Sequence, residues 1–198
     1  MKILAFVDTH GSSDALKKVV QKAKKDDVDI LACAGDISIF EQDLDKIIKK
    51  LDKIGKPVLI IPGNHESDKA MKKACEKTKN IVYLHKGMLK LKDHVFIGFE
   101  GDGFAHKDPE FERWGKRIKD QLKKKDKVVL ITHAPPHKTK LDRILDSYTG
   151  NKSIRKFIEK VDIVLAISGH IHETAGAEDK IRGTKVVNPG PFGKVYEV

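Results

Sequence analysis

Five short polar segments of this chain each follow directly on a run of apolar, mostly β-branched residues. Such runs are typical of strands buried on both faces, and they cover residues 2–7, 30–34, 58–62, 128–132 and 163–168. The polar segments are Asp8-Thr9-His10, Gly35-Asp36, Gly63-Asn64-His65-Glu66, His133 and Gly169-His170-Ile171-His172. Because ligands of open α/β sheets collect at the carboxyl ends of strands, we expect these side chains to meet at one edge of one sheet. Carboxylate, imidazole and carboxamide groups gathered there predict a metal site.

Length and composition are those of an ordinary globular protein. With 198 residues, the chain is expected to form a single domain over residues 1–198. No apolar run approaches the roughly 20 residues that span a bilayer, and the start of the chain is not typical of a signal peptide. We therefore expect a cytoplasmic protein without membrane contact. Cys33 and Cys75 show neither metal spacing nor a disulfide framework, so we expect both to be core residues.

The formal net charge is +10, and most of the basic residues are lysine. A basic chain can bind nucleic acid, but these lysines lie along every predicted helix rather than in one segment with aromatic residues. We favour a solvated lysine–glutamate surface and keep nucleic acid as an alternative, less favoured partner. In either case the positive field would attract a phosphate substrate.

The segments between these runs predict an alternation of strands and helices. Apolar residues at helical spacing predict helices near 14–23, 44–54, 67–78, 111–122 and 153–160. Ser67 and Ser153 are the expected N-caps of the third and the last helix. A hairpin is predicted over 88–97, and 186–187 and 195–196 are predicted as closing strands. This mixture predicts an α/β fold in which two mixed β-sheets pack face to face and are flanked by helices.

The spacing of the polar residues bears on how many ions such a site would hold. Asp8 and His10 stand two residues apart, as do the two histidines of the last segment, so on an extended backbone each pair leaves one face. Carboxylates and imidazoles suit Mn, Fe, Co, Ni or Zn, and the lack of thiolates argues against a structural zinc site. One ion uses fewer ligands than the sequence offers, which predicts two ions that share one carboxylate. The candidates are Asp8, His10, Asp36, Asn64, His133, His170 and His172.

Taken in order, these segments closely resemble the motif set of the calcineurin-like metallophosphoesterase superfamily. The resemblance spans residues 8–172, and His133-Ala134-Pro135-Pro136 and Asn188-Pro189-Gly190 are similar to a small prokaryotic phosphoesterase branch. It implies a four-layered αββα sandwich and two divalent metal ions, with manganese preferred and iron, nickel, cobalt or zinc as alternatives. By this resemblance Asp36 bridges the two ions. The other ligands would divide into Asp8, His10 and His172 for one ion and Asn64, His133 and His170 for the other.

The resemblance also implies a catalytic role for His65. It would stand beside the substrate and protonate the leaving oxygen or stabilise the phosphoryl charge. Many relatives carry a second aspartate three positions after the bridging one, which orients this histidine, but here that position is Ile39. We expect Glu66 or a backbone carbonyl to orient His65 instead.

Such a centre has a defined chemistry. Two divalent ions roughly 3.5–4 Å apart lower the pKa of a bridging water and align the hydroxide for in-line attack on phosphorus. A neutral ligand such as Asn64 limits the negative charge and so preserves the Lewis acidity. We therefore expect a dinuclear metal-dependent phosphoesterase that hydrolyses a phosphate-ester small molecule or nucleotide, with diesters favoured over monoesters. A nuclease of the same chemistry and a non-catalytic metal-binding interaction module are the alternatives. The loops over 98–109 and 134–149 are expected to set specificity, and no substrate-binding residue is assigned.

Overall fold

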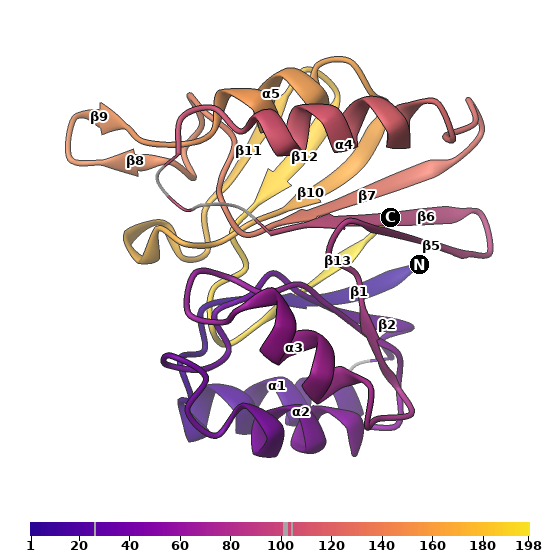
Figure 1. The fold of residues 1–198 in the computed structure, drawn as a ribbon, viewed down its shortest axis with the longest axis vertical. Coiled ribbons are helices and arrows are strands. Elements are labelled where there is room, and N and C mark those ends of the chain that lie inside the picture. The colour runs from indigo at the N-terminus through magenta and orange to yellow at the C-terminus, as the bar shows by residue number, and fades with distance from the viewer. Residues whose placement is uncertain (26, 101–102, 104) are drawn as a thin grey trace.

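Two β-sheets stack face to face in the computed structural model, which describes residues 1–25, 27–100, 103 and 105–198 (Figure 1). The first sheet has the order β13 (Lys194–Glu197), β1 (Lys2–Phe6), β2 (Ile30–Cys33), β3 (Val58–Ile60) and β4 (Ile81–Tyr83). The second has the order β11 (Glu178–Ile181), β12 (Thr184–Val187), β10 (Ile163–Ile167), β7 (Lys127–Thr132), β6 (His94–Phe99) and β5 (Gly87–Leu91). Both sheets are mixed, because β13, β11 and β5 run antiparallel to otherwise parallel neighbours.

Helices cover the outer face of each sheet, as Figure 1 shows. The first sheet carries α1 (Ser13–Lys25), α2 (Leu44–Asp52) and α3 (Asp68–Cys75), and the second carries α4 (Pro109–Lys119) and α5 (Lys152–Ile158). The result is the predicted four-layered αββα sandwich, and the predicted fold class is confirmed.

The apolar runs are continuous because each central strand is buried on both sides. In β1, Leu4 and Phe6 pack with the helices of the first layer, whereas Ile3 and Ala5 pack between the two sheets. Successive side chains of a strand point to opposite faces, so a strand inside this sandwich needs apolar residues at both parities. The core therefore consists of two helix–sheet layers and one layer between the sheets.

Of the two predicted helix N-caps, one is confirmed and the other is wrong. The Ser67 hydroxyl accepts a hydrogen bond from the Ala70 amide and caps α3, as predicted. The predicted cap of α5 is wrong, because Asn151 and not Ser153 accepts from the first amides of that helix. The Ser153 hydroxyl instead donates to Glu112 on α4 and links the two helices of the fourth layer.

Short or polar strands were not foreseen. These are β4, β11 and the hairpin of β8 (Arg143–Ile144) and β9 (Ser147–Tyr148), which projects from the region predicted as a polar connection. The predicted hairpin over 88–97 is present as β5 and β6. In the predicted loop over 98–109, Gly101, Asp102 and Phe104 lie outside the described residues.

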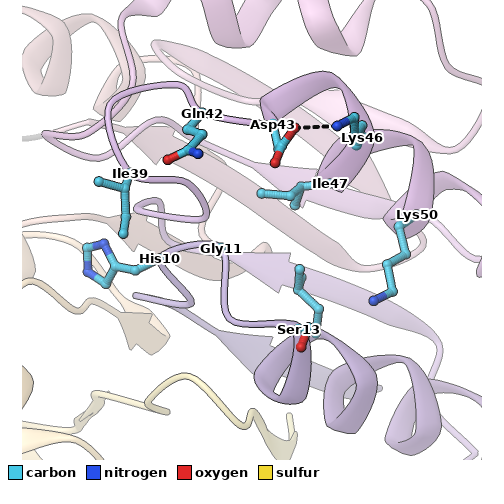
Figure 2. A pocket seen from close by; sticks show the side chains of 10 residues that line it. His10, Gly11, Ser13, Ile39, Gln42, Asp43, Lys46, Ile47 and Lys50 are labelled. Atoms are coloured by element: carbon cyan, nitrogen blue, oxygen red, sulfur yellow. Dashed lines mark hydrogen bonds and ion pairs between the residues drawn. The ribbon is translucent and has the colours of Figure 1, made fainter.

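Within the described ranges, no helix has the length and apolar character needed to cross a membrane. A cavity of about 410 Å³ opens between the start of α1 and the segment that leads into α2, and His10 forms part of its wall (Figure 2).

Candidate metal centre

The five polar segments come together, but they come from two sheets. Asp8, Asp36 and Asn64 follow β1, β2 and β3 of the first sheet, whereas His133 and His170 follow β7 and β10 of the second. The expectation of a single sheet edge is therefore wrong. The two parallel sets end at the same side of the sandwich, where the His170 amide donates to Asp8 Oδ2 at 3.0 Å across the sheets.

The backbone at the candidate ligands is left-handed rather than extended. Asp8, His10, Asp36 and His170 have φ angles of 54°, 43°, 51° and 70°. The extended geometry expected for Asp8-Thr9-His10 is thus wrong, although the two side chains still converge. Non-glycine residues in this region cost on the order of 1 kcal/mol each, and they persist where surrounding contacts enforce them.

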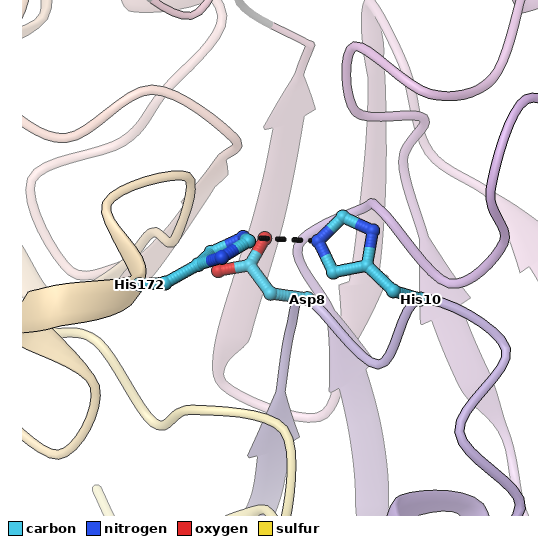
Figure 3. Close-up of side chains that lie close together, drawn as sticks. All are labelled: Asp8, His10 and His172. Carbon is cyan, nitrogen blue, oxygen red and sulfur yellow. Dashed lines mark hydrogen bonds between the residues drawn. The ribbon is translucent and has the colours of Figure 1, made fainter.

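The first group of side chains is Asp8, His10 and His172, whose potential ligand atoms all lie within 4.8 Å of one another (Figure 3). The Nε2 atoms of His10 and His172 face each other at 2.9 Å. Asp8 Oδ1 is buried and accepts no hydrogen bond from any described residue. Burial also raises the pKa of Asp8 to about 6, as expected for a carboxylate that lacks a cation.

The second group is built around Asn64, whose Oδ1 lies 3.0 Å from His133 Nε2 and 2.9 Å from His170 Nδ1. His133 is fully buried, and its Nδ1 lies 2.8 Å from the Ala34 carbonyl oxygen. Since a carbonyl oxygen can only accept, Nδ1 carries a proton, and in the neutral ring Nε2 presents a lone pair to Asn64 Oδ1. A backbone carbonyl that holds one ring nitrogen in this way is the usual arrangement for a metal-ligating histidine.

Asp36 lies between the two groups. Its Oδ2 is 3.3 Å from His133 Nε2 and 3.8 Å from His10 Nε2. Burial opposes ionisation of this carboxyl, but the hydrogen bond and charge of His133 outweigh it and lower the pKa of Asp36 to about 2. In turn, burial disfavours the charged form of His133, yet Asp36 raises its pKa. A buried anion thus lies at the position that the resemblance assigns to the bridging ligand, and it favours the charged form of His133.

His10 and His170 are suited to donate lone pairs to a metal ion. Burial lowers the pKa of His10, and burial also lowers the pKa of His170 to about 4. Both rings are therefore neutral at pH 7, the form that binds a metal ion.

Glu66 has a structural role that the sequence did not reveal. Its buried carboxylate accepts hydrogen bonds from the amides of Asp36 (3.1 Å), Gly63 (3.1 Å) and Ser38 (2.8 Å), and from the Ser38 hydroxyl (2.7 Å). It thereby ties the turn after β2 to the turn after β3. The prediction that Glu66 orients the His65 ring is wrong, because its oxygens are bound to these donors.

The His65 ring is held by other rings. Its centroid lies 4.6 Å from that of Phe40 and 4.8 Å from that of His10. Among the described residues, no backbone carbonyl or other group bonds to His65 Nδ1, so the alternative expectation of a carbonyl partner is also wrong. His65 Nε2 lies 4.0 Å from Asp36 Oδ2, and the side chain is 22% exposed, which leaves it open to a substrate.

Close packing requires two glycines at the candidate ligands, Gly169 between the two sheets and Gly63 between neighbouring turns of the first sheet. A Cβ on Gly169 would lie 2.2 Å from Val7 Cγ2 and 2.8 Å from Asp8 Oδ2. A Cβ on Gly63 would lie 2.1 Å from Asp36 Oδ1. Both positions therefore need glycine for space, because any side chain would push a candidate ligand out of place.

Asn188 supports the last segment, and its role was also missed. This residue is fully buried, and its Nδ2 donates to the Ile171 carbonyl and the Thr174 hydroxyl. These contacts hold the short 3₁₀ helix η1 (His172–Thr174) that carries His172. The signal in the sequence was the Asn188-Pro189-Gly190 block, which matched the resemblance without an assigned task.

The donor set fits divalent metal ions. One buried carboxylate oxygen has no donor, and imidazole and amide acceptor atoms face one another at about 3 Å. Facing lone pairs repel unless a proton or a cation lies between them, and nitrogen and oxygen donors suit a borderline divalent ion.

A comparison with protein families identifies the family of this chain. The family model described as calcineurin-like phosphoesterase matches residues 1–174. The chain therefore belongs to the calcineurin-like phosphoesterase family, whose members use divalent metals. No curated protein matches the chain in sequence.

Solved structures share the fold at low sequence identity. TT1561 of Thermus thermophilus superposes with a TM-score of 0.77 at 16% identity, covering 96% of this chain and 89% of that one. A dimetal phosphatase from Danio rerio gives a TM-score of 0.70 at 11% identity, covering 94% and 86%. A further crystal structure reaches a TM-score of 0.83 at 22% identity, covering 96% and 90%. At these identities the likeness supports the fold alone.

Proposed function

We propose that this protein is a dinuclear metal-dependent phosphoesterase that hydrolyses phosphodiesters. The observation that supports the proposal is the position of the buried Asp36 carboxylate, whose Oδ2 lies 3.3 Å from His133 Nε2 and 3.8 Å from His10 Nε2. Membership in the phosphoesterase family gives the class of reaction.

We assign the candidate ligands to two ions, and the short distances within each group support this assignment. Asp8, His10 and His172 would hold one ion, and Asn64, His133 and His170 the other, with Asp36 shared between them. When bound, the two ions would supply Lewis acidity to the phosphate oxygens and a water of lowered pKa. We prefer manganese, and these donors also accept iron, cobalt, nickel or zinc.

The chain's own residues prepare the site for this chemistry. Asp36 is fixed by the backbone amide of His65, which donates to its Oδ1 at 2.9 Å, and its own amide is held by Glu66. His65 stands at the open side of the centre, where its ring can donate a proton to the leaving oxygen of the ester. Contact with Phe40 and His10 limits rotation of that ring in place of a hydrogen bond.

Steady-state kinetics with an aryl phosphodiester and the matching monoester tests this proposal. Protein stripped of metal and reloaded with Mn²⁺, Fe²⁺, Co²⁺, Ni²⁺ or Zn²⁺ should hydrolyse the diester faster than the monoester. Absence of turnover above that of Asp36→Asn, with every metal and both substrates, would refute the enzyme proposal.

Two further measurements separate the alternatives. Fewer than one ion per chain at saturation would favour the non-catalytic module. Steeply salt-dependent cleavage of DNA or RNA would favour the nuclease. A protein that contacts many phosphates releases their counterions on binding, so its affinity falls as the salt concentration rises.

A further inference from the structure

The cavity beside His10 has the size of a small-molecule site. Its volume of about 410 Å³ lies within the range of ligand pockets in proteins. Figure 2 shows it between His10 and Ile39 at one end and the α2 residues Lys46 and Lys50 at the other. The cavity therefore leads from the candidate metal centre along the outside of the first sheet.

The cavity starts on the side of the centre where His65 stands. The rings of His10 and His65 lie 4.8 Å apart, and Ile39 immediately precedes Phe40, whose ring lies 4.6 Å from that of His65. If His65 protonates the leaving oxygen, the alcohol part of the ester must lie on this same side. The cavity is then the space next to the reacting bond into which that part extends.

The wall of the cavity changes character along its length. Its aliphatic wall is formed by Ile39, which lies beside His10, and by Leu16 and Ile47. Ile39 is 45% exposed, so part of its side chain is available for contact with a ligand. This part of the wall suits an apolar portion of a ligand.

The far end of the cavity is positively charged. Lys46 is paired with Asp43 at 2.6 Å, a contact drawn in Figure 2, so these two charges compensate each other. Lys50 is half-buried and forms no hydrogen bond or ion pair with any residue that the structure describes. The cavity thus holds one uncompensated ammonium group at the end away from the metal centre.

We propose that this cavity binds the alcohol part of the substrate, and that this part has an apolar middle and a second anionic group that pairs with Lys50. The proposal rests on the proposed function, because it takes the phosphoester to be held at the metal centre. The anionic group is a carboxylate or a phosphate-type group, and both pair with an ammonium ion.

Three methyl aryl phosphates test the proposal, with phenyl, 4-(carboxymethyl)phenyl or 4-(phosphonomethyl)phenyl as the leaving group. In both anionic leaving groups, a methylene separates the added anion from the ring, so the anion has little effect on the pKa of the leaving phenol. Lys50→Gln should lower kcat/KM about tenfold for the anionic substrates and leave the phenyl substrate unchanged. Lys50→Arg should restore most of the loss. Lys49→Gln removes the same charge from an exposed position of α2 outside the cavity and should change neither. The ratio of the two anionic substrates tells carboxylate from phosphate recognition.

Calorimetric binding of hydrolysis-resistant phosphonate analogues separates this proposal from the enzyme proposal. Tighter binding of the anionic analogues that is lost in Lys50→Gln, without turnover of any ester, would keep the cavity's role and reject the phosphodiesterase. Equal kcat/KM effects of Lys50→Gln on all three substrates, or equal binding of all three analogues to the unaltered protein, would overturn the cavity's role.

Discussion

The first sheet contributes every oxygen atom of the candidate centre, whereas the second contributes only imidazoles. Asp8, Asp36 and Asn64 follow strands of the first sheet, and His133, His170 and His172 follow strands of the second. In the first set, Glu66 holds the turn that carries Asp36. In the second, the Ala34 carbonyl holds His133, and Asn188 holds the segment that carries His172. Neither sheet edge alone can complete either group, so the centre depends on how the sheets stack.

Removal of the shared carboxylate should have the largest effect. Asp36→Asn should lower metal content to below one ion per chain and reduce kcat at least about hundredfold, since both groups lose their common anion. Metal analysis and steady-state kinetics measure the two effects. His172→Ala should remove only one ion per chain, and equal metal loss in the two variants would contradict the division into two groups. Asp142→Asn, which alters a buried carboxylate outside the centre, should keep two ions.

The seam between the sheets is the next most sensitive feature. Gly169→Ala should lower the free energy of unfolding by about 2–3 kcal/mol, because the added Cβ would lie 2.2 Å from Val7 Cγ2. Urea titration of the metal-free protein measures this change. Gly183→Ala is a matched control, since nothing lies within 4 Å of its Cβ, and it should change stability by less than about 0.5 kcal/mol. Similar effects of the two substitutions would show that the sheets do not pack tightly at this point.

Metal binding should stabilise the stacked sheets. At a free metal concentration of 100 times the dissociation constant, one ion should add about 2.7 kcal/mol to the free energy of unfolding. Thermal unfolding at increasing Mn²⁺ measures this effect, and a chelator should reverse it. A Tm that is independent of metal would mean that the folded chain does not bind Mn²⁺ more tightly than the unfolded chain does.

The first sheet should also make metal binding dependent on pH. The pKa of Asp8 is raised to about 6 by burial, so a proton competes with metal as the pH falls below that value. Protonation of Asp8 alone should lower the affinity about tenfold between pH 7 and pH 5, and protonation of His133, whose pKa Asp36 raises, should add to this loss. Titration calorimetry in two buffers counts the protons released, which should be at least one at pH 5 and should decrease as the pH rises. Unchanged affinity between pH 7 and pH 5 would contradict a protonated Asp8.

Much of this fold could be predicted from the sequence because its central strands are buried on both faces. Runs such as 30–34 are typical of strands buried on both faces, and the polar residues that follow them lie at strand termini. The edge strand β11, Glu178–Ile181, carries three charged residues and lacks that signal. The division of the strands between two sheets was not predictable from the runs, since a central strand has the same pattern in either sheet.

At the site, residue types were predicted more readily than their geometry. The left-handed backbone of Asp8 and Asp36 is not encoded by a glycine at those positions, and it arises from contacts across the turns. The role of Glu66 depends on donors nearly 30 positions away, such as the Asp36 amide. The contact between the rings of His65 and Phe40 could not be predicted either, because it depends on how the turn after β2 folds.

The last strand gives the molecule an order of assembly. After β12 completes its part of the second sheet, the chain crosses back, and β13 pairs with β1, so that Lys2 lies opposite Glu197. The first sheet thus lacks its edge strand until the end of the chain has been made, and contacts of such large sequence separation form slowly. The segment that carries His170 and His172 lies shortly before that return. During synthesis, a nascent chain can therefore form its first three helices well before the candidate ligands from both sheets are all present.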